Sequence, residues 1–232
     1  MNENFILYHG SPEIVERPEF GKGKPYNDYG PGFYCTESLE LAREWACGSD
    51  IGGYANKYRL QSDGLTVLSL SGGQTHILNW LAVLVNNRTF RLSNDLAFEA
   101  REYLIREFLP DIRAYDIICG YRADDSYFAF ASAFLTGGLS IGQLGRAMLL
   151  GKLGEQVVLK SRKAFERIEF LGYEHAEQSL YYPKRIMRDQ QARDAFRTER
   201  TRGRASDDVY MLDILREEWK NDDPRLCRYL SE

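Results

Sequence analysis

One stretch, Asn27 to Ala46, reads NDYGPGFYCTESLELAREWA and decides the fold around it. The Gly-Pro-Gly run at 30–32 interrupts regular structure, and the three residues after it are typical of a short buried strand. Thr36 is a favourable N-cap residue, and the apolar residues that follow it recur on one helical face. The stretch therefore predicts a turn, a strand and an amphipathic helix in immediate succession.

Two aromatic residues, Tyr34 and Trp45, lie at opposite ends of this strand and helix. Side chains so placed can form the walls of a slot that holds a flat ring. The alternative is that both are ordinary core residues, and composition alone favours that alternative.

A second stretch, LYHGS at residues 7–11, comes early in the chain. The apolar run from Phe5 to Tyr8 predicts a strand. This strand ends in His9, and the following Gly10 has no side chain to keep a ligand away from the backbone. A ligand-binding position at the end of the strand is therefore expected.

Taken together, LYHGS and YGPGFYCT resemble the ADP-ribosyltransferase superfamily, in the diphtheria-toxin and poly-ADP-ribose-polymerase branch known by a His-Tyr-Glu signature. In that branch a second aromatic residue follows the Tyr at a spacing of eleven, and Trp45 stands eleven residues after Tyr34. Within the branch, the chain is most similar to a bacterial family carried as a domain of unknown function. Two further stretches of the chain match the pattern of that family: YDIICGYRADD at 115–125 and EQVVLKSRKA at 155–164. That family is viewed as toxins that are often encoded beside a small antitoxin.

The resemblance implies roles for particular residues in binding and cleaving NAD. His9 would contact a hydroxyl of the adenosine-side ribose, and the Gly10 backbone would grip the carboxamide. Tyr34 and Trp45 would sandwich the nicotinamide ring by stacking. The catalytic candidates are His9, Tyr34, Glu155 and Gln156, and the NAD-binding candidates are His9, Gly10, Ser11, Tyr34, Thr36 and Trp45.

Gln156 stands where the superfamily commonly has its catalytic Glu. The resemblance implies that Gln156 binds the 2′-hydroxyl of the ribose beside the bond that is broken. An amide can hold that hydroxyl, but it does not stabilise positive charge as a carboxylate does and cannot serve as a base. Glu155 is adjacent, and strand alternation directs the two side chains to opposite faces unless a bulge intervenes. We choose Gln156 for the cleft because it stands four residues before Lys160-Ser161, as in the family's pattern.

The composition is that of an ordinary globular protein, with 232 residues of which 44% are apolar and 28% charged. The net charge of −4 gives no overall attraction to nucleic acid or to a membrane. The four cysteines have no CxxC pairing, which favours reduced thiols and a cytoplasmic protein over a zinc site. Neither a signal peptide nor a membrane-spanning segment is expected.

We expect an α+β fold, an ADP-ribosyltransferase-like core split into two mostly antiparallel sheets with helices around them. Residues 1–173 would form the NAD-binding domain, and residues 174–232 a helical C-terminal extension that packs on it. Asp124 and Asp125 follow an expected central strand at 115–120, where they would either bind a metal or substrate or begin a helix. Nothing nearby adds further metal ligands, so we expect no metal.

The segment from Pro183 to Arg204 holds eight basic residues against three acidic ones. Pro183 suits the first turn of a long helix, and Ser206 is expected to cap a second helix. The basic helix would be a solvated surface, a dock for an antitoxin or substrate, or a face that contacts phosphates. We favour docking, because the positive charge opposes the sign of the whole chain.

The expected function is mono-ADP-ribosyl transfer from NAD to an intracellular macromolecule, either protein or nucleic acid, by a bacterial toxin that a partner holds. One alternative is an NAD glycohydrolase on the same site, where water is the acceptor. The others are a pseudo-enzyme that only binds an NAD-like ligand, and nucleic-acid binding through the basic helix.

Overall fold

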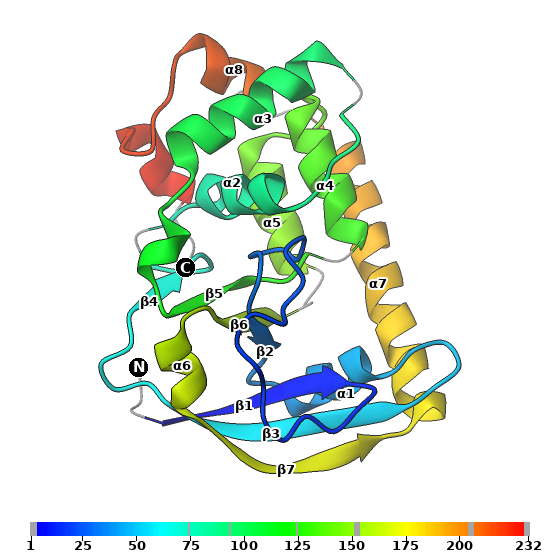
Figure 1. Ribbon diagram of the computed structural model, residues 1–232. Helices are drawn as coiled ribbons and strands as arrows, with labels where there is room; N and C mark the ends of the chain where they lie inside the picture. Colours follow the sequence, from blue (N-terminus) through cyan, green and yellow to red (C-terminus); the bar gives the residue numbers. More distant parts are fainter. Residues whose placement is uncertain are drawn as a thin grey trace. The chain divides into compact units, whose positions relative to one another are not determined.

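The structure, a computed structural model, describes residues 4–73, 75–92, 94–123, 125–150, 154–203 and 207–229. It contains two sheets together with helices, so the predicted α+β class is confirmed. The chain divides into two compact units, each assembled from three segments (Figure 1). The first unit comprises residues 1–68, 111–122 and 153–188, and the second comprises residues 69–110, 123–152 and 189–232.

The two sheets have three and four strands. The first has the order β1-β3-β7, with β1 (Asn4–Ser11), β3 (Gly53–Gln61) and β7 (Ile168–Ala176), all antiparallel to their neighbours. The second has the order β2-β6-β5-β4, with β2 (Phe33–Cys35), β6 (Glu155–Leu159), β5 (Ile117–Tyr121) and β4 (Val67–Ser69). The strand expected at 115–120 is β5, which has a neighbour on each side.

The helices fall into both units. The first unit holds α1 (Leu39–Ala46), α6 (Arg162–Glu166), the 3-10 helix η1 (Ile112–Ala114) and the start of α7 (Gln178–Thr201). The second unit holds the rest of α7 together with α2 (Ile77–Asn87), α3 (Asp95–Phe108), α4 (Asp125–Leu135), α5 (Ile141–Leu150), α8 (Met211–Arg216) and the 3-10 helix η2 (Pro224–Tyr229). Among the helices of the described residues, none combines the length and the apolar composition that crossing a membrane requires.

The core of the first unit is built from side chains of both sheets. Leu7 and Tyr58 from the first sheet meet Phe33, Val157 and Leu159 from the second. Removing this apolar surface from water is the main force that holds the sheets together.

An isolated antiparallel bridge also joins the two sheets, between Tyr8 and Thr36. The Tyr8 N–H donates to the Thr36 carbonyl at 2.8 Å, and the Thr36 N–H donates to the Tyr8 carbonyl at 2.9 Å. The strand that carries the LYHGS motif is therefore tied directly to the end of β2.

Helix α1 begins two residues later than expected. Its N-cap is Ser38, whose hydroxyl accepts a hydrogen bond from the Leu41 N–H at 3.3 Å, so the assignment of Thr36 as the cap is wrong. Thr36 is instead extended and paired with Tyr8. Two good capping residues lie close together here, and the backbone pairing of Thr36 decides between them.

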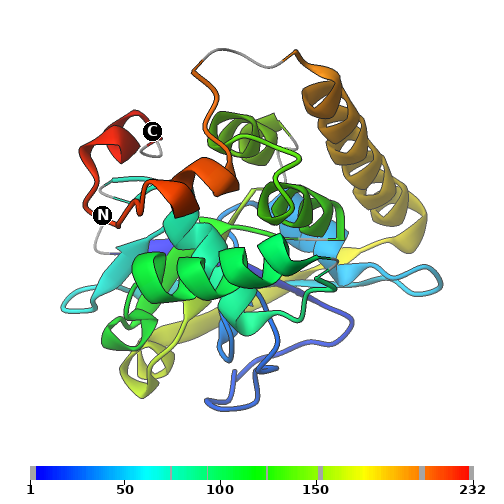
Figure 2. The ribbon, with the colours of Figure 1, turned by 90° about the horizontal axis from the view of Figure 1, so that it is seen from above.

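The C-terminal region also differs from expectation. Helix α7 starts at Gln178, and Pro183 lies inside it although the helix is continuous (Figure 2). The predicted domain boundary after Tyr173 falls within β7, which continues to Ala176. Residues 174–188 therefore belong to the first unit. The expected cap Ser206 lies outside the described residues, and the N-cap of α8 is Tyr210.

The second unit is mainly helical. Helix α2 is buried along nearly its whole length, in agreement with its continuous apolar sequence. Helix α5 begins with a capping box, in which the Ser140 N–H donates to the Gln143 side chain at 2.8 Å and the Gln143 N–H donates to the Ser140 hydroxyl at 3.2 Å. The spacing Ser140-x-x-Gln143 is the sequence signature of such a box.

Candidate functional site

The register of the second sheet decides which side chains share a face. Val157 and Leu159 of β6 point into the core of the first unit. Residues directly opposite in an antiparallel pair share a face, and successive residues alternate. Tyr34 pairs with Val158, and Gln156 is two residues before Val158, so Tyr34 and Gln156 share the face that points away from this core.

Gln156 is buried on that face, with 6% of its surface exposed. Its backbone is paired with that of Gly120 in β5. Its side-chain Oε1 is also buried, and has no hydrogen-bond partner among the described residues. Glu155 is exposed and β6 keeps a regular register on both sides, so the expected alternation is present and no bulge turns Glu155 inward.

His9, two residues before the last residue of β1, is held in one tautomer. Its Nδ1 lies 2.7 Å from the Tyr34 carbonyl oxygen, and since a carbonyl only accepts, Nδ1 must carry a hydrogen. Burial lowers the pKa of His9, against the opposing effect of the Tyr34 contact, so the ring is neutral near pH 7. Nε2 is then a hydrogen-bond acceptor. The ring also packs on Phe33, with 4.5 Å between ring centroids.

Tyr34 is fixed by the turn that precedes it. Its hydroxyl donates to the Gly30 carbonyl at 2.6 Å and accepts from the Tyr29 N–H at 3.0 Å. A side chain held at both ends keeps its ring in one orientation, which a stacking wall requires.

Gly10 has a structural reason to be glycine. A Cβ at this position would lie 2.1 Å from the Ala42 carbonyl oxygen and 2.9 Å from Cβ of Trp45. The expectation was that a ligand approaches here, whereas the neighbour that approaches is helix α1. Tyr8 directs its N–H and C=O to Thr36. Gly10 comes two residues later in the same strand, so its N–H and C=O point to the same side of β1 as those of Tyr8.

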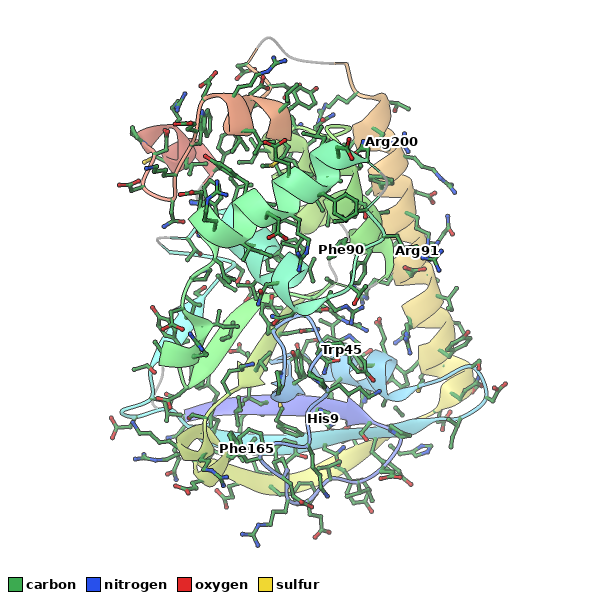
Figure 3. The ribbon with its side chains drawn as sticks, turned by 45° about the horizontal axis from the view of Figure 1, so that its top comes forward. His9, Trp45, Phe90, Arg91, Phe165 and Arg200 are labelled. Atoms are coloured by element: carbon green, nitrogen blue, oxygen red, sulfur yellow. The ribbon has the colours of Figure 1, made fainter. Side chains whose placement is uncertain are left out.

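Trp45 projects from α1 close to the end of the strand that carries His9 (Figure 3). The Arg122 guanidinium lies over its ring, 4.7 Å from the centroid. The indole Nε1 is buried and has no hydrogen-bond partner within the described part of the chain. Trp45 therefore carries an unused donor, on a side chain whose Cβ lies against Gly10.

The two remaining candidates, Ser11 and Thr36, have hydroxyls that already serve the fold. The Ser11 hydroxyl accepts from the Glu13 N–H at 3.2 Å. Thr36 is 2% exposed, and its hydroxyl accepts from the Ser38 N–H at 3.2 Å. Both shape the backbone around the site.

A cavity of about 610 Å³ opens beside His9 and Tyr34. Its other walls come from the loop at 13–24, from Gly32 and from Phe165 of α6. Trp45 and Gln156 do not line this cavity. The loop carries the basic residues Lys22 and Lys24, of which Lys22 is paired with Glu19 at 2.7 Å.

Two positioning residues were missed from the sequence. Asn56 is fully buried in β3; its amide donates to the carbonyls of His9 and Glu13 and accepts from the Val15 N–H at 2.9 Å. It thereby ties the cavity loop to β1. Lys160 donates to backbone carbonyls of the turn before Tyr34. Side chains of β3 alternate between the core and the other face, and Asn56 is a polar residue at a core position. In the sequence, only this break in the alternation pointed to Asn56.

The acidic pair after β5 stays untested. Asp124 lies outside the described residues, and Asp125 begins α4 with a side chain that is also outside them. Within the described ranges, no group of three or more His, Cys, Asp or Glu side chains is placed to hold a metal ion.

These features define a class of protein: an α+β domain in which a His, a tyrosine and a buried amide come from three strands and a tryptophan comes from a helix. The chain belongs to the family described as "Protein of unknown function (DUF3990)", whose model matches residues 5–170. No curated protein and no solved structure gives a significant match to the chain.

Proposed function

We propose that the chain is a mono-ADP-ribosyltransferase that splits the nicotinamide–ribose bond of NAD and transfers ADP-ribose to an intracellular macromolecule. The observation that carries the proposal is a pair of buried, unpaired polar atoms, Nε1 of Trp45 and Oε1 of Gln156. Both belong to residues that the superfamily resemblance assigns to the NAD site.

Unpaired buried polar atoms are uncommon because each costs about 1–3 kcal/mol in lost hydration. A ligand that supplies an acceptor to the indole N–H and a hydroxyl to the amide oxygen would recover that cost. The nicotinamide half of NAD carries both groups, a carboxamide oxygen and ribose hydroxyls. The donor and the acceptor therefore fit this substrate.

The proposed mechanism gives each residue one task. The Gly10 backbone and the indole N–H of Trp45 hold the carboxamide, and the fixed ring of Tyr34 stacks on the nicotinamide. Oε1 of Gln156 accepts the ribose 2′-hydroxyl, which orients the sugar for cleavage. Nε2 of His9 accepts a hydroxyl of the second ribose.

The bond from the ribose carbon to nicotinamide breaks with its electron pair, which leaves with nicotinamide. The ribose carries positive charge until the acceptor's nucleophile forms the new bond and releases its proton. Gln156 is neutral and cannot take up that proton. The base is therefore expected to come from the acceptor.

Glu155 favours a second candidate, binding of NAD without turnover. It is the carboxylate nearest to Gln156 along the chain, and it is exposed on the opposite face of β6. A site with an amide in place of the catalytic carboxylate stabilises the positively charged ribose less than a His-Tyr-Glu site does. An NAD glycohydrolase, which uses water as the acceptor, is the third possibility on the same residues.

Incubation with NAD labelled in its adenylate part, together with cell extract, tests the proposal. Label on material that protease or nuclease releases identifies a transferase and its acceptor class. Free labelled ADP-ribose identifies a glycohydrolase. Intact NAD, with a raised melting temperature of the protein, identifies a binding protein. Intact NAD without a thermal shift refutes NAD as the ligand.

The rival proposal, nucleic-acid binding through α7, has less support. Arg193 is paired with Asp189 at 2.9 Å, and Arg197 is paired with Asp194 at 3.0 Å. Arginines with acidic neighbours on the same helix are typical of a solvated surface. Docking of an antitoxin on α7 stays a proposal, and a steep loss of binding with salt would identify a nucleic-acid partner instead.

A further inference from the structure

The turn at residues 27–32 precedes Tyr34 and forms part of the cavity wall. Asn27 and Gly32 line the cavity. The Tyr29 N–H and the Gly30 carbonyl both bond to the Tyr34 hydroxyl. Whatever holds this turn in place therefore also sets the tyrosine ring.

The contact that holds the turn comes from the end of β6. The Lys160 ammonium donates to the carbonyl of Tyr29 and to the carbonyl of Pro31, each at 2.5 Å. Gly32 packs closely against the same segment, because a Cβ at this position would be 2.6 Å from Cγ1 of Val158 and 3.4 Å from Cδ of Lys160. The lysine thus bonds the two carbonyls that flank Gly30.

The geometry points to Lys160 as a positioning residue, whose ammonium sets the orientation of Tyr34 and of the adjoining cavity wall by clamping the turn at 27–32. It lies four residues after Gln156, directly beyond the last residue of β6. One short segment therefore places the buried amide and also holds the turn that orients the stacking ring.

Charge is what makes this clamp strong. Hydrogen bonds from an ionised donor are roughly twice as strong as those from a neutral donor. Burial lowers the pKa of Lys160 to about 8, so the clamp weakens as the pH rises through that value. The ionisable groups of the neighbouring elements are Asp28, Tyr29 and Tyr34 from the turn and β2, Asp116 before β5, and Lys163 of α6.

The first measurement needs no substrate: hydrogen–deuterium exchange of peptides covering 27–34, at pH 7, in the full chain. Lys160→Met removes the ammonium and keeps the apolar stem, so exchange there should accelerate about tenfold. Lys160→Arg keeps a charged donor and should stay within about twofold of the wild type. Lys163→Met is the matched control, because Lys163 bonds the carbonyl of another turn, at Gly64.

Unchanged exchange at 27–34 in Lys160→Met would overturn the inference. Equal acceleration in Lys163→Met would do so as well, because the effect would then be general loosening. If Lys160→Met does not fold, Lys160→Gln takes its place with the same expectation.

A second measurement rests on the proposed function. The KM for NAD should rise about tenfold in Lys160→Met, while kcat changes by less. In the wild type the KM should rise between pH 7 and 9, and in Lys160→Arg it should stay flat, because a guanidinium does not titrate in this range. A wild type without NAD cleavage refutes the proposed function, and the exchange data then decide the role of Lys160 alone.

Discussion

The buried amide of Gln156 is where stability and binding conflict. Its oxygen is hidden from water and lacks a hydrogen-bond partner within the described part of the chain. A side chain selected for stability alone at this position would be apolar, as are Val157 and Val158 next to it. The amide is therefore best explained by a ligand that completes its hydrogen bonding.

Replacing Gln156 by Leu should separate the two effects. The variant has nearly the same volume and loses an unpaired acceptor, so its unfolding free energy should rise by about 1 kcal/mol. NAD turnover should fall at least about 100-fold, since a preorganised contact to the reacting sugar is lost. Urea denaturation and a nicotinamide-release assay measure the two quantities.

Glu155→Ala is the control for that variant. Its side chain is exposed on the other face of the strand, so turnover should stay within about twofold of the wild type. The reverse ranking of the two variants would assign the catalytic role to the carboxylate.

His9→Asn tests the acceptor at Nε2. The amide nitrogen of Asn can occupy the place of Nδ1 and donate to the Tyr34 carbonyl, so the variant should melt at the wild-type temperature. It has no group at the position of Nε2, so the NAD-induced rise in melting temperature should be lost. His175→Asn, at an exposed position of β7, should keep that rise. A full NAD effect in His9→Asn would remove this ring from the site.

At the scale of elements, the first half of α7 clamps the helix that carries Trp45. Arg188 forms a bidentate pair with Glu44 of α1, with both contacts at 2.8 Å. Lys184 bonds Glu40, and Arg185 bonds the Cys47 carbonyl at the end of α1. Part of the positive charge that suggested a docking surface is therefore already paired with groups of the first unit.

The pair of Glu44 and Arg188 should show strong coupling in a double-mutant cycle. The Glu44 side chain is only 3% exposed, against 27% for Arg188. Arg188→Met should therefore leave a buried charge without its partner and cost about 2–4 kcal/mol of unfolding free energy. The double variant Glu44→Leu/Arg188→Met should recover most of that loss. Additive single effects in thermal or urea unfolding would contradict a buried pair.

At the scale of the whole molecule, each unit contains a histidine that is shielded from water: His9, half-buried, in the first and His76, buried, in the second. Burial lowers the pKa of both below the ordinary value of 6.5. Above that value both rings are neutral whether the chain is folded or not. Below it the unfolded chain takes up protons that the folded chain resists, so acid favours unfolding.

The unfolding free energy should therefore fall as the pH is lowered from 6.5 toward 5. This window lies above the ordinary pKa values of carboxylates, so it isolates the histidines. His9→Asn and His76→Gln should each flatten the decline. Urea denaturation at half-unit pH steps measures the slope, and identical slopes in the wild type and both variants would contradict the burial effect.

Local patterns determined much of this protein. The turn, β2 and α1, the capping box at Ser140 and the opposite directions of Glu155 and Gln156 all follow from neighbours within four residues. Such features depend on backbone geometry that repeats every two residues in a strand or every 3.6 residues in a helix. A short segment of sequence therefore contains all the residues that determine them. Their identification required no knowledge of the partner strand.

The tertiary structure decided what depends on contacts between distant segments. Thr36 lost the capping role because it pairs with Tyr8, and His9 took one tautomer because its ring meets the Tyr34 carbonyl. Asn56 and Lys160 became positioning residues only when strands far apart in the chain came together. Sequence spacing does not specify which distant backbone groups a side chain will meet, because that depends on sheet order, register and burial formed by the whole chain.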